Sequence, residues 1–118
     1  MVRMPTDIIT TFITREQLKQ FAHNTFVDLV KAVVDIERGI MAVGGELHAD
    51  EETALLEDGS KQSNLWGINL YPDKTGEDFI EFDSMINLRP SQNNRSRNVD
   101  DPAVRQQIIT IVNKLIPS

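Results

Sequence analysis

LWGINLYPDKTGEDFIEFDSMINL, residues Leu65–Leu88, is the stretch that decides the fold. Leu65–Tyr71 and Phe79–Leu88 alternate apolar and polar side chains, which is typical of strands with one buried face. The Pro72–Asp78 segment between them contains Gly76 and is short enough to close a hairpin. Because a hairpin pairs antiparallel strands, we exclude a purely parallel sheet.

A short strand and a long helix are expected before the hairpin. Asp7–Ile13 is rich in β-branched residues and is typical of a strand. Thr14 and Gln17 match the two positions of a capping box, which predicts a helix start. We expect this helix to continue to Gly39, which can adopt the left-handed conformation that ends helices. Its apolar stripe at helical spacing would consist of Leu18, Phe21, Ala22, Phe26, Leu29, Val30 and Val33.

Three further elements are expected on either side of the hairpin. Ile40–Val43 is apolar enough for a strand, and the glycine pair after it would turn the chain, with Glu46–His48 as a possible return strand of a tiny hairpin. The acid-rich run from Ala49 favours a short helix that ends at Gly59. A final helix begins at Asp101, a suitable N-cap followed by a proline.

The expected element order is therefore β-α-β-α-β-β-α. We predict a two-layer α+β fold with a mixed or antiparallel sheet of about four strands, two main helices and one short helix. A chain of 118 residues fits a single domain, 1–118, and we expect residues 1–6 to be flexible.

Composition argues against several classes of protein. The net charge of −6 disfavours broad nucleic-acid binding, because that affinity comes mainly from neutralising phosphates with Lys and Arg. The absence of cysteine excludes disulfides and thiolate metal sites. No apolar run approaches the roughly 20 residues that span a bilayer, and we expect no secretory signal. These observations predict a soluble, cytoplasmic protein that does not bind membranes and needs no cofactor.

Basic residues gather immediately after the hairpin, although the chain as a whole is acidic. Arg89, Arg95 and Arg97 lie within nine positions, and no acid occurs between Ser84 and Val99. Arginine guanidinium groups suit carboxylate and phosphate oxygens. This segment, the arginine loop (residues 89–97), is the best candidate for a site that binds a small anion or an acidic protein partner. The acids of residues 46–58 are alternative salt-bridge partners for it.

Strand alternation predicts which side chains accompany the arginine loop. The length of the turn gives the pairs Tyr71–Phe79, Asn69–Glu81 and Gly67–Asp83. The face toward the helices would carry Trp66, Ile68, Leu70, Ile80, Phe82, Ser84, Ile86 and Leu88. The opposite face would carry Asn69, Tyr71, Glu81, Asp83, Asn87 and Arg89, with the apolar Phe79 and Met85.

The polar face has two interpretations. It is either the ordinary solvated side of an antiparallel sheet or a shallow pocket that the arginine loop extends. In the second interpretation the ligand-binding residues are Asp83, Asn87, Arg89, Asn94, Arg95 and Arg97.

A second constellation is Glu46, His48 and Asp50, which alternate and would share one side of an extended segment. Carboxylate and imidazole ligands suit Zn, Mn or Fe. The geometry is lost if Asp50 belongs to a helix, and no second histidine lies nearby, so we predict no metal site. An acid-base role for His48 is the alternative.

The strings VDIERGIMAVGGELHADEETALLEDGS (34–60), LWGINLYP (65–72) and DSMINLRPSQNNRSR (83–97) resemble a family of small bacterial and archaeal proteins whose domain has no known function. The resemblance extends from about Ile8 over nearly the whole chain. It implies a single-domain protein of this length and supplies no activity, cofactor or catalytic residue.

Three hypotheses for the function remain, and no common catalytic motif is present to choose among them. The first is a module that binds an anionic ligand or acidic partner through the arginine loop and the polar face. The second is a small hydrolase or phosphate-handling enzyme that uses Asp83 or Glu81 with Arg89, Arg95 and His48. The third is a structural or regulatory subunit of an oligomer.

Overall fold

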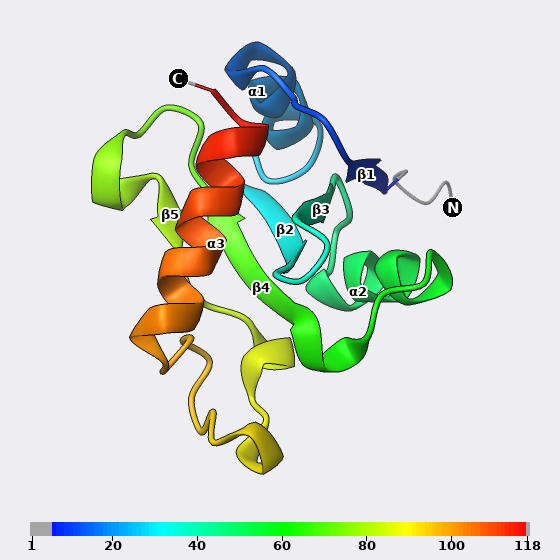
Figure 1. Ribbon diagram of the computed structural model, residues 1–118. Helices are drawn as coiled ribbons and strands as arrows, with labels where there is room; N and C mark the ends of the chain where they lie inside the picture. The colour runs from blue at the N-terminus through cyan, green and yellow to red at the C-terminus, as the bar shows by residue number, and fades with distance from the viewer. Residues whose placement is uncertain (1–5, 118) are drawn as a thin grey trace.

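The computed structural model describes residues 6–117 and is built on one five-stranded sheet in the order β1-β3-β2-β4-β5 (Figure 1). The strands are β1 (Asp7–Ile9), β2 (Val30–Asp35), β3 (Ile40–Val43), β4 (Leu65–Leu70) and β5 (Ile80–Glu81). Every neighbouring pair is antiparallel. The α+β class and the hairpin between β4 and β5 are therefore confirmed, with one strand more than the four expected.

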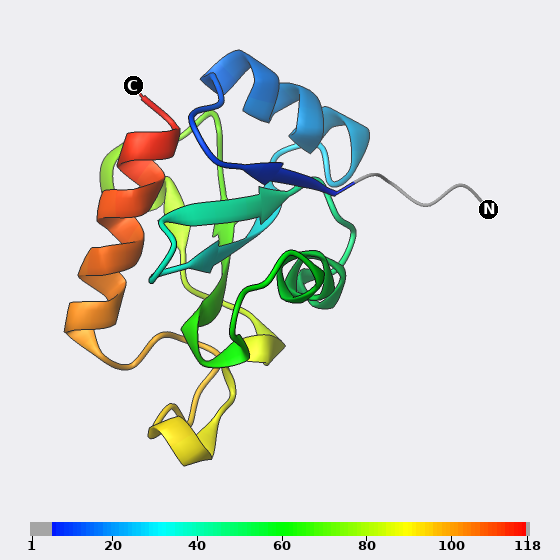
Figure 2. The ribbon, with the colours of Figure 1, turned by 45° about the vertical axis from the view of Figure 1, so that its right-hand side comes forward.

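Helices cover both faces of this sheet. Figure 2 shows β2 and β3 lying between α1 (Arg15–Asn24) and α2 (His48–Glu57). α3 (Pro102–Leu115) packs with α1 on one face and encloses the larger core. Leu55 of α2 packs on Val33 from the other face and forms a smaller core. α2 thus adds a partial third layer to the two layers expected.

The long first helix predicted from Thr14 to Gly39 is wrong in its second half. The capping box forms, since the Gln17 N–H donates to Thr14 Oγ1 over 3.1 Å, but the helix ends at Asn24. The chain then turns through Val27, which has a φ of 74°, and continues as β2. The β-branched run in β2 favours a strand, and residues three or four apart satisfied the helical period by coincidence. Gly39, with a φ of 67°, instead lies in the turn between β2 and β3.

Of three further local predictions, one is confirmed, one is wrong and one falls partly outside the described residues. Asp101 caps α3 by accepting a hydrogen bond from the Ala103 N–H over 2.9 Å. The tiny hairpin into Glu46–His48 does not form, because His48 begins α2. Of the residues 1–6 expected to be flexible, 1–5 lie outside the described residues. Within residues 6–117, no helix is both long and apolar enough to cross a membrane.

The predicted register of the hairpin is confirmed at its closed end. Asn69 pairs with Glu81 across β4 and β5. The Tyr71 N–H donates to the carbonyl oxygen of Phe79 over 2.9 Å.

The second strand of the hairpin is shorter than predicted. It ends at Glu81, so the expected pair of Gly67 with Asp83 does not form. Ser84 caps a 3₁₀ turn, Met85–Asn87, which folds the chain back over β4. A Cβ built on Gly67 would lie only 2.6 Å from the Cβ and Oγ of Ser84, so the turn sits directly on the glycine.

This early turn corrects part of the predicted division of side chains between the two faces. Trp66, Ile68, Leu70, Ile80 and Phe82 do lie on the side of α1 and α3. Ile86 packs instead into the smaller core under α2, and Leu88 is 40% exposed. Phe79, expected on the polar face, is buried in the larger core. Alternation fails wherever the backbone leaves the extended conformation.

A buried carboxyl group ties α2 to the turn that follows β3. Glu51 is fully buried, and its Oε2 accepts a hydrogen bond from the Gly45 N–H over 3.1 Å. Its Oε1 has no partner among the described residues. Burial raises the pKa of Glu51 well above its ordinary value of 4.5. The protonated form is therefore the one that this position favours.

Glu51→Gln should raise the free energy of unfolding increasingly as the pH rises. A raised pKa in the folded state means that the native protein binds this proton more tightly, so the wild type loses stability from pH 4.5 upward through the folded pKa. We expect the variant to gain about 1 kcal/mol or more at pH 8 and nothing at pH 4. Urea unfolding at several pH values measures this. The exposed Glu46→Gln is the control, and equal pH profiles for Glu51→Gln and the wild type would contradict the account.

Gly67→Ala should destabilise the fold by about 1–3 kcal/mol, because the new methyl group overlaps the 3₁₀ turn. Thermal unfolding measures the loss. Ser84→Gly removes the two closest atoms, so Gly67→Ala combined with Ser84→Gly should lose less than the sum of the single changes. Strict additivity would show that the contact is not the cause.

Candidate functional site

One row of polar side chains crosses the sheet on the face that α2 leaves partly open. Lys31 of β2 pairs with Asn69 of β4, which pairs in turn with Glu81 of β5. Side chains from α2, from the end of the hairpin and from the arginine loop surround this row. We call the set the polar patch: Lys31, His48, Asn69, Tyr71, Glu81, Asp83 and Arg97.

Asn69 lies at the centre of the polar patch and is only 8% exposed. Its Nδ2 donates to Glu81 Oε1 over 2.8 Å, and the Tyr71 hydroxyl donates to the same oxygen over 3.1 Å. Burial, and then the hydrogen bond to Glu81, raises the pKa of Tyr71. The Oδ1 of Asn69 has no partner among residues 6–117. A buried acceptor is therefore left unsatisfied on the residue that pairs with Lys31, whose ammonium lies 4.9 Å from the centre of the Phe26 ring.

His48 borders the patch at the N-terminus of α2. Its Nε2 lies 2.8 Å from the carbonyl oxygen of Ile68, which can only accept, so Nε2 carries the proton. Burial lowers the pKa of His48, and the nearby charges of Lys31 and Arg97 lower it further. At neutral pH the ring is therefore neutral and its Nδ1 is an acceptor. His48 thus approaches the polar face, as an acid-base role for it requires.

An ion pair between Arg97 and Asp83 also borders the patch. Arg97 Nε lies 2.7 Å from Asp83 Oδ1, and the two side chains are 55% and 44% exposed. An ion pair this accessible stabilises a fold by at most about 1 kcal/mol. The backbone beneath it is held more firmly, because the carbonyl of Arg97 accepts hydrogen bonds from Ser84 and Asn87. The backbone of Arg97 is thus fixed, whereas its exposed guanidinium group can exchange Asp83 for another partner.

Asn87 and Asn94, two of the predicted ligand-binding residues, are buried and bonded within the protein. Asn87 accepts from the Gly67 N–H over 2.8 Å and donates to the Gly67 carbonyl over 2.9 Å. Asn94 donates to the carbonyls of Asn87 and Asn98 and accepts from the Asp100 N–H, each over 2.7 Å. Both amides hold the arginine loop in place.

Arg89 is directed toward the protein rather than the solvent. Its guanidinium lies 4.2 Å from the centre of the Trp66 ring and donates to the carbonyls of Gln62 and Leu65. Nε donates to the carbonyl of Ile86 over 3.1 Å. Burial lowers the pKa of Arg89. The contacts of this arginine tie the arginine loop to the beginning of β4.

Two carboxylates outside the arginine loop bond to it: Asp83 pairs with Arg97, and Asp100 accepts hydrogen bonds from Arg95 and Ser96. Asp100 accepts hydrogen bonds from the Arg95 N–H over 2.9 Å and from the Ser96 hydroxyl over 2.6 Å. The bond from Ser96 is the main cause of a lowered pKa for Asp100. Among residues 6–117, the exposed guanidinium of Arg95 makes no hydrogen bond or ion pair within the chain. Of the three loop arginines, Arg95 and Arg97 thus keep their charges accessible.

The metal constellation does not assemble. His48 and Asp50 both belong to α2, and Glu46 is exposed in the turn before it. Within the described part of the chain, no group of three metal-ligating side chains could hold an ion.

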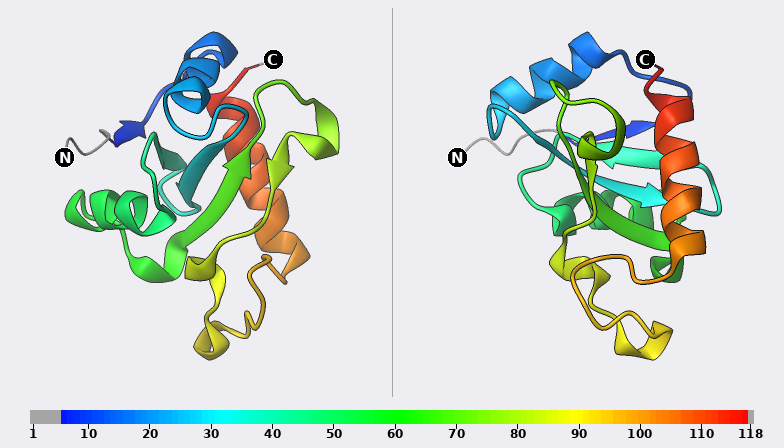
Figure 3. Two further views of the ribbon diagram at one scale, coloured as in Figure 1. Left: turned by 180° about the vertical axis from the view of Figure 1, so that it is seen from behind. Right: turned by 90° about the vertical axis from the view of Figure 1, so that its left-hand side faces the viewer.

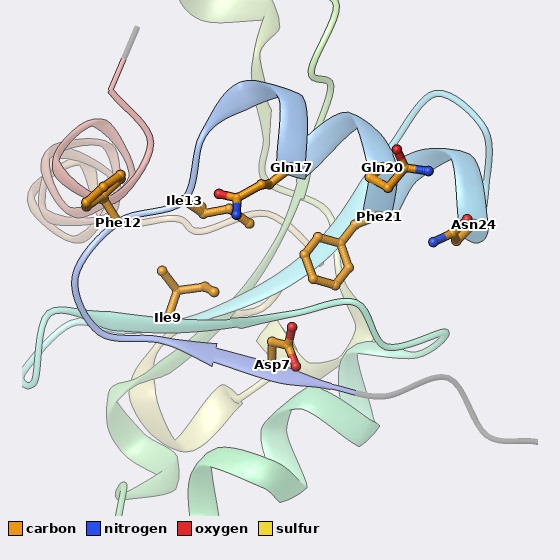
Figure 4. Close-up of a pocket in the computed structure, with 8 residues that line it drawn as sticks. All are labelled: Asp7, Ile9, Phe12, Ile13, Gln17, Gln20, Phe21 and Asn24. Carbon is orange, nitrogen blue, oxygen red and sulfur yellow. The ribbon is translucent and has the colours of Figure 1, made fainter.

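A hollow of about 340 Å³ lies between β1 and α1, on the side of the sheet away from the polar patch (Figure 4). Its apolar floor includes Ile9 and Phe21, and the amides of Gln20 and Asn24 lie along its rim with the carboxylate of Asp7. None of the described residues that line it is basic. Its chemistry does not favour an anion, in contrast to the polar patch.

Lys31 is the site residue that the sequence interpretation missed. The helix predicted to continue to Gly39 includes Lys31, and a helix would not pair it with Asn69 as β2 does. The alternation in Lys31–Asp35 was the available signal, since Lys31, Val33 and Asp35 share one face of β2.

No curated protein and no solved structure matches the chain. A family model described as "Protein of unknown function (DUF5674)" matches residues 7–115 and confirms the resemblance to a family whose domain has no known function. With nearly its full length matched, the chain belongs to the DUF5674 family of proteins of unknown function.

Proposed function

We propose that the protein is a binding module whose polar patch takes a small anion that also carries a hydroxyl group, such as a sugar phosphate or a hydroxy acid. The observation that carries this proposal is the unpartnered Oδ1 of Asn69, a buried acceptor on the residue that pairs with Lys31 across the sheet. Buried polar atoms without partners are rare and call for an explanation. A ligand hydroxyl would satisfy this oxygen, and the ligand's charge would lie against Lys31.

Arg97 supplies a second positive charge to such a ligand. Its pair with Asp83 is half exposed, so exchanging the carboxylate for a ligand oxygen costs little. Arginine can then bind a phosphate or carboxylate through two parallel hydrogen bonds. In this proposal Asp83 and Arg97 remain ligand-binding residues, Arg95 is an auxiliary charge at the rim, and Asn87, Arg89 and Asn94 support the loop.

A hydrolase or phosphate-handling enzyme is the second candidate, favoured by the neutral His48. Its Nδ1 is in the protonation state of a general base, and the carboxylate of Asp83 lies near enough to influence its pKa. Arg89 does not fit the role of charge stabiliser in this scheme, because its donors are bonded to backbone carbonyls. The oligomer subunit and the cytoplasmic location stay predictions.

Titration with ribose 5-phosphate should produce saturable NMR shifts at the amides of Lys31, Asn69 and Arg97. Inorganic phosphate and ribose alone should each bind more weakly, because each supplies only half of the required contacts. Asn69→Ala should weaken binding of the sugar phosphate about tenfold, the effect of one hydrogen bond to a buried group.

Arg97→Gln should weaken binding to a similar extent. Its matched control is Arg38→Gln, since Arg38 also forms a half-exposed pair with an aspartate, over 2.8 Å, but away from the patch. Shifts scattered over the whole chain, or equal effects of the two arginine variants, would contradict the proposal. Slow hydrolysis of the ribose 5-phosphate that stops in His48→Gln would favour the enzyme instead.

A further inference from the structure

A larger hollow of about 720 Å³ lies between β5 and α3, on the opposite side of the sheet from the polar patch. In Figure 3, α3 runs beside the end of the sheet that β5 forms. The walls come from the turn before β5, from β5 itself and from one stripe of α3 at four-residue spacing. Arg15 of α1 and Asn98 complete the walls.

The floor of this groove is apolar. Ile80 and Phe82 are half-buried and extend the larger core to the edge of the sheet. Ile109 faces them from α3, and Phe79 lies buried beneath the stacked Arg15 side chain. A hollow of this volume with an apolar floor and a few polar groups has the character of a ligand site.

One wall of the groove is an unpaired strand edge. β5 is the last strand of the sheet and pairs only with β4. Because the Tyr71 N–H bonds to the carbonyl of Phe79, the alternation of an antiparallel ladder turns the N–H and C=O of Ile80 away from β4. Among residues 6–117, the backbone of Phe82 makes no hydrogen bond. The outward backbone groups of Ile80 and the unbonded backbone groups of Phe82 are therefore available to another strand.

Two guanidinium groups face this groove, each held through one nitrogen. Nη1 of Arg15 donates to the carbonyls of Pro72 and Lys74, and the group lies 4.1 Å from the centre of the Phe79 ring. Nη1 of Arg105 donates to the carbonyl of Val99 over 2.7 Å. Within the described residues, Nε and Nη2 of both arginines make no hydrogen bond. Each arginine thus keeps the two-donor side that suits a carboxylate.

We propose that the groove binds an extended peptide with apolar side chains and a free C-terminal carboxylate. The peptide adds a strand to the outer edge of β5, its alternate side chains lie on the floor beside α3, and its carboxylate binds Arg105 or Arg15. Strand addition supplies main-chain hydrogen bonds for affinity, and the floor and the arginines supply selectivity. This site is independent of the polar patch, which lies on the other face of the sheet.

The test uses the ¹⁵N-labelled full chain and a hexapeptide of alternating threonine and valine. With a free carboxylate, the peptide should shift the amides of Ile80 and Phe82 and slow their hydrogen exchange. The same peptide with a C-terminal amide should bind about tenfold more weakly. A version N-methylated at alternate residues should bind too weakly to measure, because it cannot complete the strand pairing.

Arg105→Gln and Arg15→Gln identify which arginine holds the carboxylate, and Arg38→Gln is the control for loss of a charge. The expected result is a loss of affinity of about tenfold in one of the first two variants for the carboxylate peptide and no loss for the amide. Unchanged ¹⁵N spectra of the free variants establish that they fold.

Three outcomes would overturn the proposal. Equal affinity for the peptide with a free carboxylate and the peptide with a C-terminal amide would show that neither arginine binds the carboxylate. Shifts centred on β1 or on the polar patch would place the peptide elsewhere. Dimerisation through β5 that excludes the peptide, detected by sedimentation of the free protein, would assign the edge to a second copy of this chain.

Discussion

The rest of the site depends on the two hydrogen bonds between the side-chain amide of Asn87 and the backbone of Gly67. β5 ends at Glu81, which pairs with Asn69 of β4. No residue of β5 therefore pairs with Gly67, two positions before Asn69. Asn87 fills this position with a side chain, accepting from the Gly67 N–H over 2.8 Å and donating to its carbonyl over 2.9 Å. Two buried backbone groups that would otherwise lose a hydrogen bond, at about 1–3 kcal/mol each, are thereby satisfied. Only glycine leaves room for the turn that carries Asn87.

This bond also decides where the candidate ligand-binding groups lie. Nδ2 of Asn87 donates to the carbonyl of Arg97 over 3.0 Å, so the hairpin end and the arginine loop are fastened at one point. The pair of Asp83 with Arg97 is positioned next to Asn69 as a result. Arg89 bonds to the distant carbonyl of Gln62, and Asn94 bonds to the nearby carbonyls of Asn87 and Asn98, which completes the support of the loop. A loop rich in charged and amide side chains is thus mostly a rigid support for a few accessible groups.

Features with a local cause could be predicted from the sequence, and features with a distant cause could not. The capping box at Thr14 and the N-cap at Asp101 depend on residues two or three positions apart, and the pairing of Asn69 with Glu81 follows from the length of the turn between them. Their interactions are encoded in short motifs and in a turn length. The residues of β2 fit both the helical period and the two-residue period of a strand. Their β-branched side chains favour the strand, so the first helix ends earlier than predicted. The end of β5 depends on Gly67, which lies in a different strand. The alternation of apolar and polar residues continues after Glu81, so it could not predict where β5 ends.

The candidate site also contains features that could be predicted from the sequence and features that could not. The cluster of basic residues after the hairpin is evident in the sequence, and it identified the region of Asp83 and Arg97. The inward direction of Arg89 could not be predicted, because two of the three backbone carbonyls that it bonds, those of Gln62 and Leu65, lie more than 20 positions earlier in the chain. Membership of a family of unknown function adds no ligand, so the unpartnered oxygen of Asn69 and the open edge of β5 carry the functional proposals.

Hydrogen exchange of the Gly67 amide tests the central claim most directly. If Asn87 replaces a strand at this position, the Gly67 amide should exchange as slowly as the β4 amides that bond to β2. In Asn87→Ala its exchange should accelerate about tenfold or more relative to those neighbours, since the loss is local. Fast exchange of Gly67 in the wild type, or an equal acceleration along all of β4 in the variant, would contradict the account.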